Sequence, residues 1–242
     1  MAKSPEKNRF TFSLLLYDYS LILILTFTII LNSCGIDTYP YPDPPALDTI
    51  EEPIEGGSVF RFGNTPNNNV TFFEGFEVYY KFYSAIPEHS TFKKYEADII
   101  TLENSPTLAK LKALNFTRFY SDTLKLPLIP INSEIKKDVF SIYIDFSNMG
   151  LPDKPYPEVR YLDQTFPIFR YVREKEYEIL EEKGFLPEDF SSDYMDIDGT
   201  YYNSQYQHVY LVLFVLAYGK SDLIYDLYSK PAYLGRIRIT TQ

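Results

Sequence analysis

The side chains whose types and spacing could support chemistry are few in this sequence. The two histidines, His89 and His208, are far apart in the chain, and neither belongs to a His-Glu-x-x-His spacing or another arrangement typical of zinc ligands. We therefore expect each histidine to be an ordinary polar side chain.

Three neighbouring aspartates, Asp193, Asp196 and Asp198, suggest a calcium site, because hard cations bind clustered oxygens. Alignment of this segment to an EF-hand loop places Tyr194 and Gln205 at the first and last positions, where the loop needs carboxylates. A solvated acidic turn is the preferred interpretation, and a calcium site of another geometry is the alternative.

Motifs for catalysis are absent from the sequence. It contains no Gly-x-Ser-x-Gly elbow, P-loop or Gly-x-Gly-x-x-Gly, and ten glycines in 242 residues leave little room for phosphate-binding loops. Paired carboxylates for glycoside hydrolysis are recognised by distances that a sequence does not contain. We therefore predict no catalytic residue, no metal ligand and no cofactor, and expect a protein that is not an enzyme.

Aromatic side chains are abundant, with 23 tyrosines and 19 phenylalanines but no tryptophan. Tyrosine combines apolar area with a polar tip, which suits a sugar-binding platform or a protein-binding surface. The candidates for such a binding face are Tyr79, Tyr83, Tyr201 and Tyr202. Most of the other aromatic residues are interpreted as packing residues of strands.

The single cysteine, Cys34, excludes an intramolecular disulfide and follows an apolar run. A basic N-terminus precedes this run, which extends without interruption over the eleven residues 21–31. A transmembrane helix needs roughly 20 residues, whereas the hydrophobic region of a signal peptide needs about 7–15. The length therefore indicates a signal peptide.

The residues before the cysteine, Leu31-Asn32-Ser33-Cys34, resemble the lipobox of bacterial lipoproteins, with an aliphatic residue at −3 and a small residue at −1. The resemblance implies cleavage between Ser33 and Cys34, removal of residues 1–33, and a lipid on the Cys34 thiol. Such a lipid would anchor the protein to a membrane without spanning it. A buried cysteine after an ordinary signal peptide or a membrane anchor is the alternative.

Composition limits what the rest of the chain can be. Hydrophobic residues make up 45% of the chain, which excludes a disordered protein, and a formal charge of −10 argues against a nucleic-acid partner. Residues 34–57 are rich in proline and acidic residues, so we predict a solvated tether. Residues 58–242 contain no apolar run of 18 residues and are predicted to form a soluble domain.

Short aromatic and β-branched runs between turn signals predict a mainly β domain. Alternation of apolar and polar residues is clearest in 70–84 and 138–146, and other strands are expected at 58–62, 95–102, 115–120, 164–172 and 233–240. Helices are expected at 107–114, after a Ser105-Pro106 start signal, and at 173–183, which is rich in Glu and Lys.

The predicted strand 209–218 is apolar on both faces. A sandwich strand usually leaves one face in contact with water, so either a segment of the chain covers the second face or a partner does. Because a long stretch of sequence lies in the middle of the chain, we expect the chain itself to provide the cover.

Two stretches of this region resemble a fibronectin type III domain: Val59-Phe60-Arg61-Phe62 followed by Gly75-Phe76-Glu77-Val78-Tyr79-Tyr80, and later Leu213-Phe214-Val215-Leu216-Ala217-Tyr218-Gly219. The resemblance implies an immunoglobulin-like β-sandwich in which Phe62 takes the family's Trp position. Phe76 and Leu211 are 135 residues apart, roughly 100 more than the family allows. We therefore predict an insertion at about 84–205 that holds extra strands and two short helices.

The lipobox and the aromatic-rich strands are also similar to spirochaete-type lipoproteins, which implies a location in the bacterial cell envelope. We expect a membrane-anchored, non-catalytic interaction or structural module with a protein or glycan partner. The alternative is a carbohydrate-binding protein or a hydrolase whose site lies in the insertion. Fold analogy alone supports the interaction function.

Overall fold

A computed structural model describes residues 41–54, 56–68, 70–84, 93–149, 156–173, 180–185, 189–191, 193–198, 208–221 and 225–240. The proposed signal peptide, Ser33, Cys34, His89, Tyr201 and Tyr202 lie outside these residues, as does the side chain of His208.

The described residues are mainly β and form a sandwich-like arrangement of two larger sheets. The first sheet has the order β1 (Val59–Gly63), β5 (Ser141–Asp145), β6 (Glu158–Tyr161) and β7 (Gln164–Pro167), all antiparallel. The second is built on β2 (Phe73–Ser84) and β11 (His208–Lys220), with β13 (Ala232–Thr240) and β12 (Asp226–Tyr228) also paired to β11. The prediction of a mainly β fold is confirmed.

Three short strands from the middle of the chain pair in turn with the free edge of β2. They are β4 (Ile129–Pro130) and β3 (Thr117–Arg118), which run antiparallel to it, and β10 (Ile197–Asp198), which runs parallel. The segment between β2 and β11 thus completes the sheet as well as covering it.

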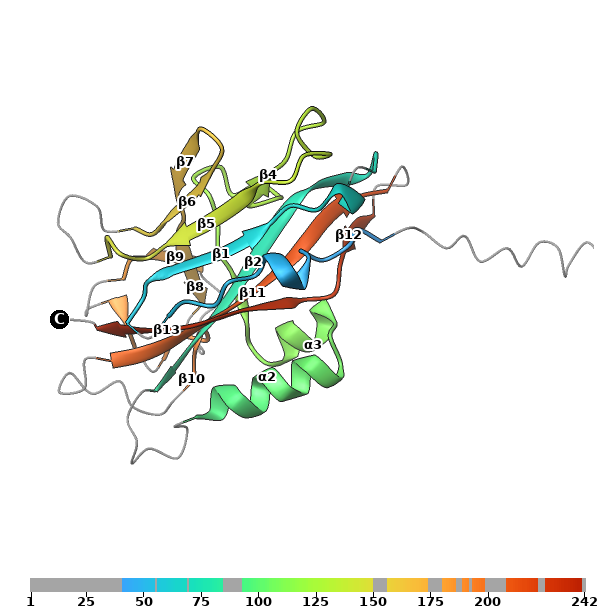
Figure 1. Ribbon diagram of the computed structural model, residues 1–242. Helices are drawn as coiled ribbons and strands as arrows, with labels where there is room; N and C mark the ends of the chain where they lie inside the picture. The colour runs from blue at the N-terminus through green and yellow to red at the C-terminus, as the bar shows by residue number, and fades with distance from the viewer. Residues whose placement is uncertain are drawn as a thin grey trace, which may run out of the picture. The chain divides into compact units, whose positions relative to one another are not determined.

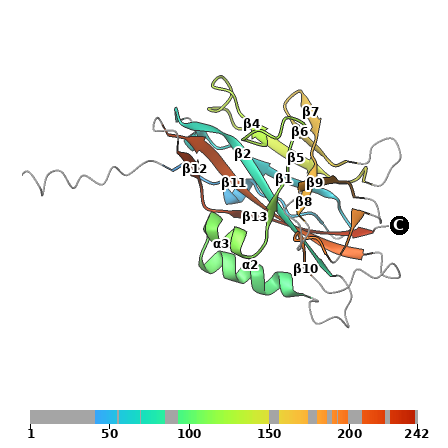
Figure 2. The ribbon, with the colours of Figure 1, turned by 180° about the vertical axis from the view of Figure 1, so that it is seen from behind.

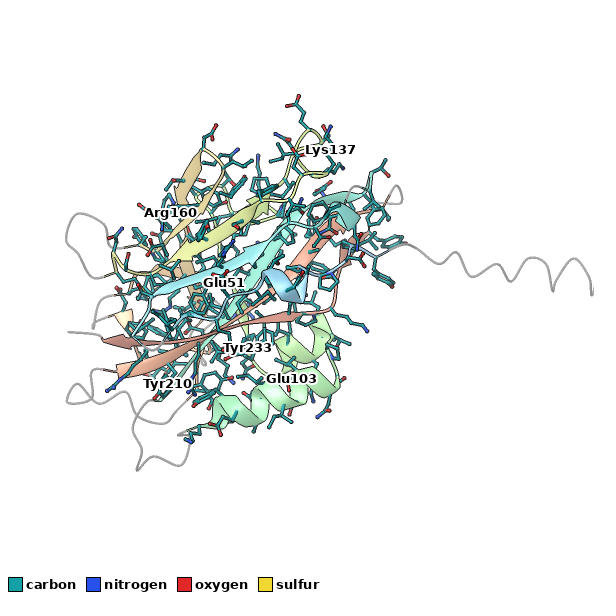
Figure 3. The ribbon with its side chains drawn as sticks, in the orientation of Figure 1. Glu51, Glu103, Lys137, Arg160, Tyr210 and Tyr233 are labelled. Carbon is teal, nitrogen blue, oxygen red and sulfur yellow. The ribbon has the colours of Figure 1, made fainter. Side chains whose placement is uncertain are left out.

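Two helices form a third layer against the second sheet. Helix α2 (Lys94–Asn104) and helix α3 (Leu108–Ala113) lie on one side of β11 and β13, whereas β5, β6 and β7 lie on the other (Figure 1), and the view from behind agrees (Figure 2). Tyr210 and Tyr233 lie on the helix-facing side, opposite Glu103 of α2 (Figure 3).

The alternation of side chains along β2 and β11 explains the three layers. On β11, Leu211, Leu213, Val215 and Ala217 are buried between the two sheets, while Val212, Phe214 and Leu216 are buried against the helices. Because successive strand residues point to opposite faces, a strand that is apolar on both faces must be covered on both. The prediction that a segment from the middle of the chain provides this cover is confirmed.

Two secondary-structure predictions are wrong. Residues 95–102 belong to α2 because Tyr95, Asp98 and Leu102 are buried at a helical spacing; the β-branched run 99–101 had favoured a strand. The described part of the expected helix 173–183 is strand, because β8 (Arg170–Arg173) pairs with β9 (Leu180–Lys183), and residues 174–179 lie outside the described residues. Cross-strand pairing there outweighs the helix propensity of Glu and Lys.

The first helical turn of α3 is capped by Thr107 rather than by Ser105. The Thr107 hydroxyl accepts a hydrogen bond from the Lys110 amide (3.1 Å), whereas Ser105 is exposed and ends α2. We expect Thr107→Ala to lower the free energy of unfolding by about 1 kcal/mol in urea denaturation. Ser105→Ala is the matched control and should change it by less than about 0.5 kcal/mol; equal effects would contradict the assignment of the cap.

The predicted solvated tether is wrong for its second half. Pro42 and Pro45 are buried, the Gly63 amide donates to the Thr49 hydroxyl (2.9 Å), and the Glu51 amide donates to the Arg61 carbonyl (3.0 Å). A proline-rich, acidic composition predicted solvation, but such a segment can also pack along the surface of a domain.

Candidate functional site

A pocket of about 520 Å³ lies where β3, β8, β9 and β12 come close to α3. We call it the Arg118 pocket. Its cations are Lys112 at the end of α3, Arg118 on β3 and Arg173 on β8. No Asp, Glu, His or Cys is among the described residues that line it. The pocket is therefore locally cationic in a chain whose formal charge is −10.

Tyrosines form most of the aromatic surface of the Arg118 pocket: Tyr79, Tyr120, Tyr171 and Tyr228. The Arg118 guanidinium carbon lies 4.2 Å from the centre of the Tyr120 ring, and the Tyr120 and Tyr171 rings meet edge to face at 5.1 Å. This stacking holds the guanidinium and both rings in a defined arrangement. Burial, with the nearby Glu77 and Asp226 carboxylates, raises the pKa of Tyr228 to about 12, so its hydroxyl stays protonated.

A fully buried carboxyl group, that of Glu77 on β2, lies behind this pocket. Its Oε1 accepts a hydrogen bond from the Leu128 amide (2.9 Å), while its Oε2 lies 3.9 Å from an Arg118 nitrogen and has no hydrogen-bond partner among the described residues. Burial raises the pKa of Glu77 to about 7, although Arg118 and the Leu128 hydrogen bond lower it. Glu77 therefore changes charge near neutral pH.

The candidate binding face of four tyrosines is not formed by the two members that the structure describes. Tyr79 is only 3% exposed and Tyr83 is fully buried, both within the layer between the second sheet and the helices. The prediction that Tyr79 and Tyr83 form an exposed binding face is wrong, because α2 and α3 cover the face of β2 on which both side chains lie. Tyr201 and Tyr202 lie outside the described residues, so their candidacy stays a prediction.

Tyr83 instead belongs to a buried ionic cluster between β2 and α2. The Tyr83 hydroxyl and the Lys81 ammonium group both donate to Asp98 Oδ2, at 2.8 and 3.1 Å. Lys81 also pairs with Asp198 (2.7 Å), which in turn pairs with Lys94 of α2. The cluster joins the helix layer and β10 to β2.

A second buried ion pair joins Asp196 to Arg170, which are 1% and 0% exposed. Arg170 donates to both oxygens of Asp196 (2.9 and 3.3 Å) and to the carbonyls of Gly184 and Asp189, and the Tyr80 hydroxyl also donates to Asp196 (2.9 Å). All these contacts lie beside the phenylalanine-rich core. Every charge in the pair is matched by hydrogen bonds, which a buried ion pair requires.

These ion pairs show that the three aspartates predicted as a possible calcium site do not act together. Asp196 and Asp198 point their carboxylates at different cations, Arg170 and Lys81, and do not converge on one point. Asp193 is exposed and accepts a hydrogen bond from Ser191. Within the described part of the chain, no three His, Cys, Asp or Glu side chains are placed to hold a metal ion. The preferred interpretation as a solvated turn is wrong for Asp196, which is structural and buried.

Sequence reasoning missed Arg118, Glu77 and Arg170. A signal was present for Glu77, because its carboxylate stands between Phe76 and Val78 in an aromatic-rich stretch that the sequence predicts to be a strand. No signal in the sequence pairs Arg170 with Asp196 or brings Arg118 next to Tyr171, since these contacts depend on the tertiary fold.

Comparison of the chain with protein-family models, curated proteins and solved structures found no match. The chemistry of the described side chains therefore carries the functional argument.

Proposed function

We propose that this chain is a lipid-anchored lipoprotein of a bacterial cell envelope whose β domain binds a ligand or partner without catalysing a reaction. The lipobox-like residues Leu31, Ser33 and Cys34, after an eleven-residue apolar run, support the anchor. Among the described residues, no helix is long and apolar enough to cross a membrane.

The finer fold assignment, an immunoglobulin-like or fibronectin type III-like sandwich with an insertion at about 84–205, is part of the proposal. It is supported by the placement of β1 in one sheet and of β2, β11 and β13 side by side in the other. The ring of Phe62, in the proposed Trp position, lies 5.3 Å from that of Phe76 across the sandwich core. By these bounds the insertion holds both helices, the edge strands β3, β4 and β10, and β5 to β9, so β1 is the one described strand of the first sheet that lies outside it.

The observation that carries the binding function is the lining of the Arg118 pocket. Its described walls offer aromatic faces, tyrosine hydroxyls and cations, which recognise ligands, and no carboxylate or imidazole that could move a proton on a substrate. Tyrosine and arginine are also the side chains most enriched where proteins bind partners.

A carbohydrate-binding protein with its site in the insertion is the second candidate. It is favoured by the position of the pocket, because all its lining residues other than Tyr79 and Tyr228 fall between 112 and 195. Sugars present apolar ring faces and hydroxyl groups, which tyrosine side chains can contact with their rings and hydrogen-bond with their tips.

The packing of residues 41–54 shortens the tether that the proposal requires. Six residues separate the proposed lipid on Cys34 from Tyr41, the first described residue, and the seven Cα–Cα steps between the two residues span at most about 25 Å. We therefore expect the domain to work close to the membrane surface rather than at the end of a long stalk.

The anchor is tested by Cys34→Ala in bacteria fed a fatty-acid probe. The unaltered protein should incorporate the probe and sediment with membranes, whereas the variant should incorporate none, because it lacks the thiol that takes the lipid. Ser33→Ala is the matched control, since alanine is equally small and should preserve labelling. Persistent labelling of the Cys34→Ala variant would refute the proposed lipid attachment.

A further inference from the structure

The cations of the Arg118 pocket are available to a ligand. Lys112 and Arg173 are exposed, and the Arg118 side chain is 21% exposed, so all three reach solvent or the pocket interior. The described lining residues include three cations and no carboxylate, while the Glu77 and Asp226 carboxyl groups lie behind Arg118 and Tyr228 rather than in the lining. A concentration of one sign of charge in a concave site raises the local concentration of ligands with the opposite sign.

The Arg118 guanidinium is held in place but has donor capacity to spare. A guanidinium carries five N–H donors in a planar fork. Its hydrogen bond to the Leu124 carbonyl is long (3.4 Å), and the nearest Glu77 oxygen is 3.9 Å away, beyond hydrogen-bond distance. A carboxylate that enters the pocket can therefore take up to two short, charge-assisted hydrogen bonds from Arg118.

The other walls of the pocket fit the body of such a ligand rather than its charge. The Tyr120 and Tyr171 rings meet at 5.1 Å beside the guanidinium, and Leu180 and Met195, which are 44% and 37% exposed, contribute apolar surface. Exposed Leu and Met side chains at a pocket gain free energy when a ring covers them. A volume of about 520 Å³ accommodates one or two sugar-sized rings.

We infer that the Arg118 pocket binds a small ring-bearing carboxylate of the sugar-acid class, with the carboxylate on Arg118 and the ring against Tyr120 and Tyr171. The inference rests on the proposed binding function and names its ligand class. Lys112 and Arg173 attract the anion and support its orientation from the sides of the pocket.

The test is calorimetric titration of the full chain, purified in detergent, with three probes: glucuronate, glucose and acetate. Glucuronate combines the ring and the carboxylate, glucose lacks the carboxylate, and acetate lacks the ring. We expect glucuronate to bind at least about tenfold more tightly than either of the others, because a charge-assisted bidentate contact and ring burial each contribute a tenfold effect or more.

Variants locate the site. Arg118→Gln should raise the Kd for glucuronate about tenfold or more, and Lys112→Gln, an exposed change that leaves the core intact, about two- to fivefold. Arg160→Gln is the matched control, because Arg160 is an arginine of the other sheet, on β6 (Figure 3). It pairs with Asp145, and its replacement should leave the Kd unchanged. If Arg118→Gln fails to fold, the Lys112→Gln result decides.

The inference would be overturned by equal affinity for glucuronate and glucose, by equal affinity for glucuronate and acetate, or by a Kd for glucuronate that neither Arg118→Gln nor Lys112→Gln changes. Equal binding of glucuronate and glucose in this pocket would leave the proposed binding function standing and remove the anionic class alone. Absence of heat with all three probes would overturn the ligand class, while lipid labelling at Cys34 would still report separately on the anchor.

Discussion

Replacing Asp196 with alanine is expected to lower the free energy of unfolding by about 3–5 kcal/mol, the largest effect of any single change considered for this domain. The variant leaves the Arg170 guanidinium, which is 0% exposed, without its carboxylate, and it removes the acceptor of the Tyr80 hydroxyl. An uncompensated charge in the interior costs far more than the net contribution of the intact pair. The loss is measured by urea denaturation followed by far-UV circular dichroism.

The control for this prediction stands three residues earlier. Asp193→Ala removes the same charge from the same turn, but Asp193 is exposed, so the free energy of unfolding should change by less than about 0.5 kcal/mol. Comparable losses in the two variants would show that Asp196 is solvated like its neighbour and would contradict the buried pair. A loss confined to Asp196→Ala supports a structural role for the 193–198 segment.

Replacing Glu77 with glutamine is expected to make the domain more stable at alkaline pH and to change its pH dependence. The pKa of Glu77 is raised from 4.5 to about 7 in the folded domain, mainly because the carboxyl group is buried. Unfolded chains ionise this group above about pH 4.5, whereas the folded chain keeps the proton until about pH 7. The favourable contribution of the neutral carboxyl is therefore complete below pH 4.5 and is lost as the pH rises through 7.

The size of this effect follows from the shift. A difference of about 2.5 pKa units corresponds to about 3 kcal/mol, which the unaltered protein loses between pH 4.5 and pH 8 and the glutamine variant does not. The measurement is the difference in unfolding free energy between the two proteins, taken at pH 4.5, 6, 7 and 8. It should grow by about 3 kcal/mol across the series.

A surface carboxylate controls for the general effect of charge removal. Glu134 is exposed, and Glu134→Gln should not reproduce a difference that grows with pH. Any constant offset caused by packing of the glutamine amide cancels in the comparison between pH values. A difference between Glu77→Gln and the unaltered protein that is the same at every pH would contradict a carboxyl group that is neutral in the folded domain below pH 7.

Side-chain patterning along the chain was sufficient to predict much of the β framework. The alternation at 70–84 and 138–146 anticipated β2 and β5, and the doubly apolar stretch 209–218 anticipated β11 together with its need for two covering layers. These predictions succeed because a strand with a buried face must carry apolar residues at every second position. Helix α2 was missed because β-branched residues at 99–101 favour strands locally, while burial at 95, 98 and 102 is decided by the sheet beneath.

The buried ion pairs and the Arg118 pocket could not be predicted from the sequence. Arg170 and Asp196 are 26 residues apart, Lys81 and Asp198 are further apart still, and each ion pair exists because two distant segments meet at the edge of β2. The Arg118 pocket has the same origin, since its walls come from five separate stretches of chain. Motifs defined by residue spacing detect ligands that lie on one helix, strand or loop. They do not detect sites whose residues come from several distant elements.

The proposed lipid anchor and the proposed binding function of the domain fit together. A lipid on Cys34 and six residues of intervening chain would hold the β domain near a membrane, and the Arg118 pocket would then sample ligands close to that surface. Tight anchoring needs more than one acyl chain, as bacterial lipoproteins of this lipobox type carry.

The most direct test of this proposal is the intact mass of the protein extracted from bacterial membranes with detergent. The account predicts a chain of residues 34–242 whose N-terminal Cys34 carries a diacylglyceryl group, and whose lipid mass is released together with an N-terminal peptide on proteolysis. A mature chain that begins at another residue, or that begins at Cys34 with an unmodified thiol, would contradict it.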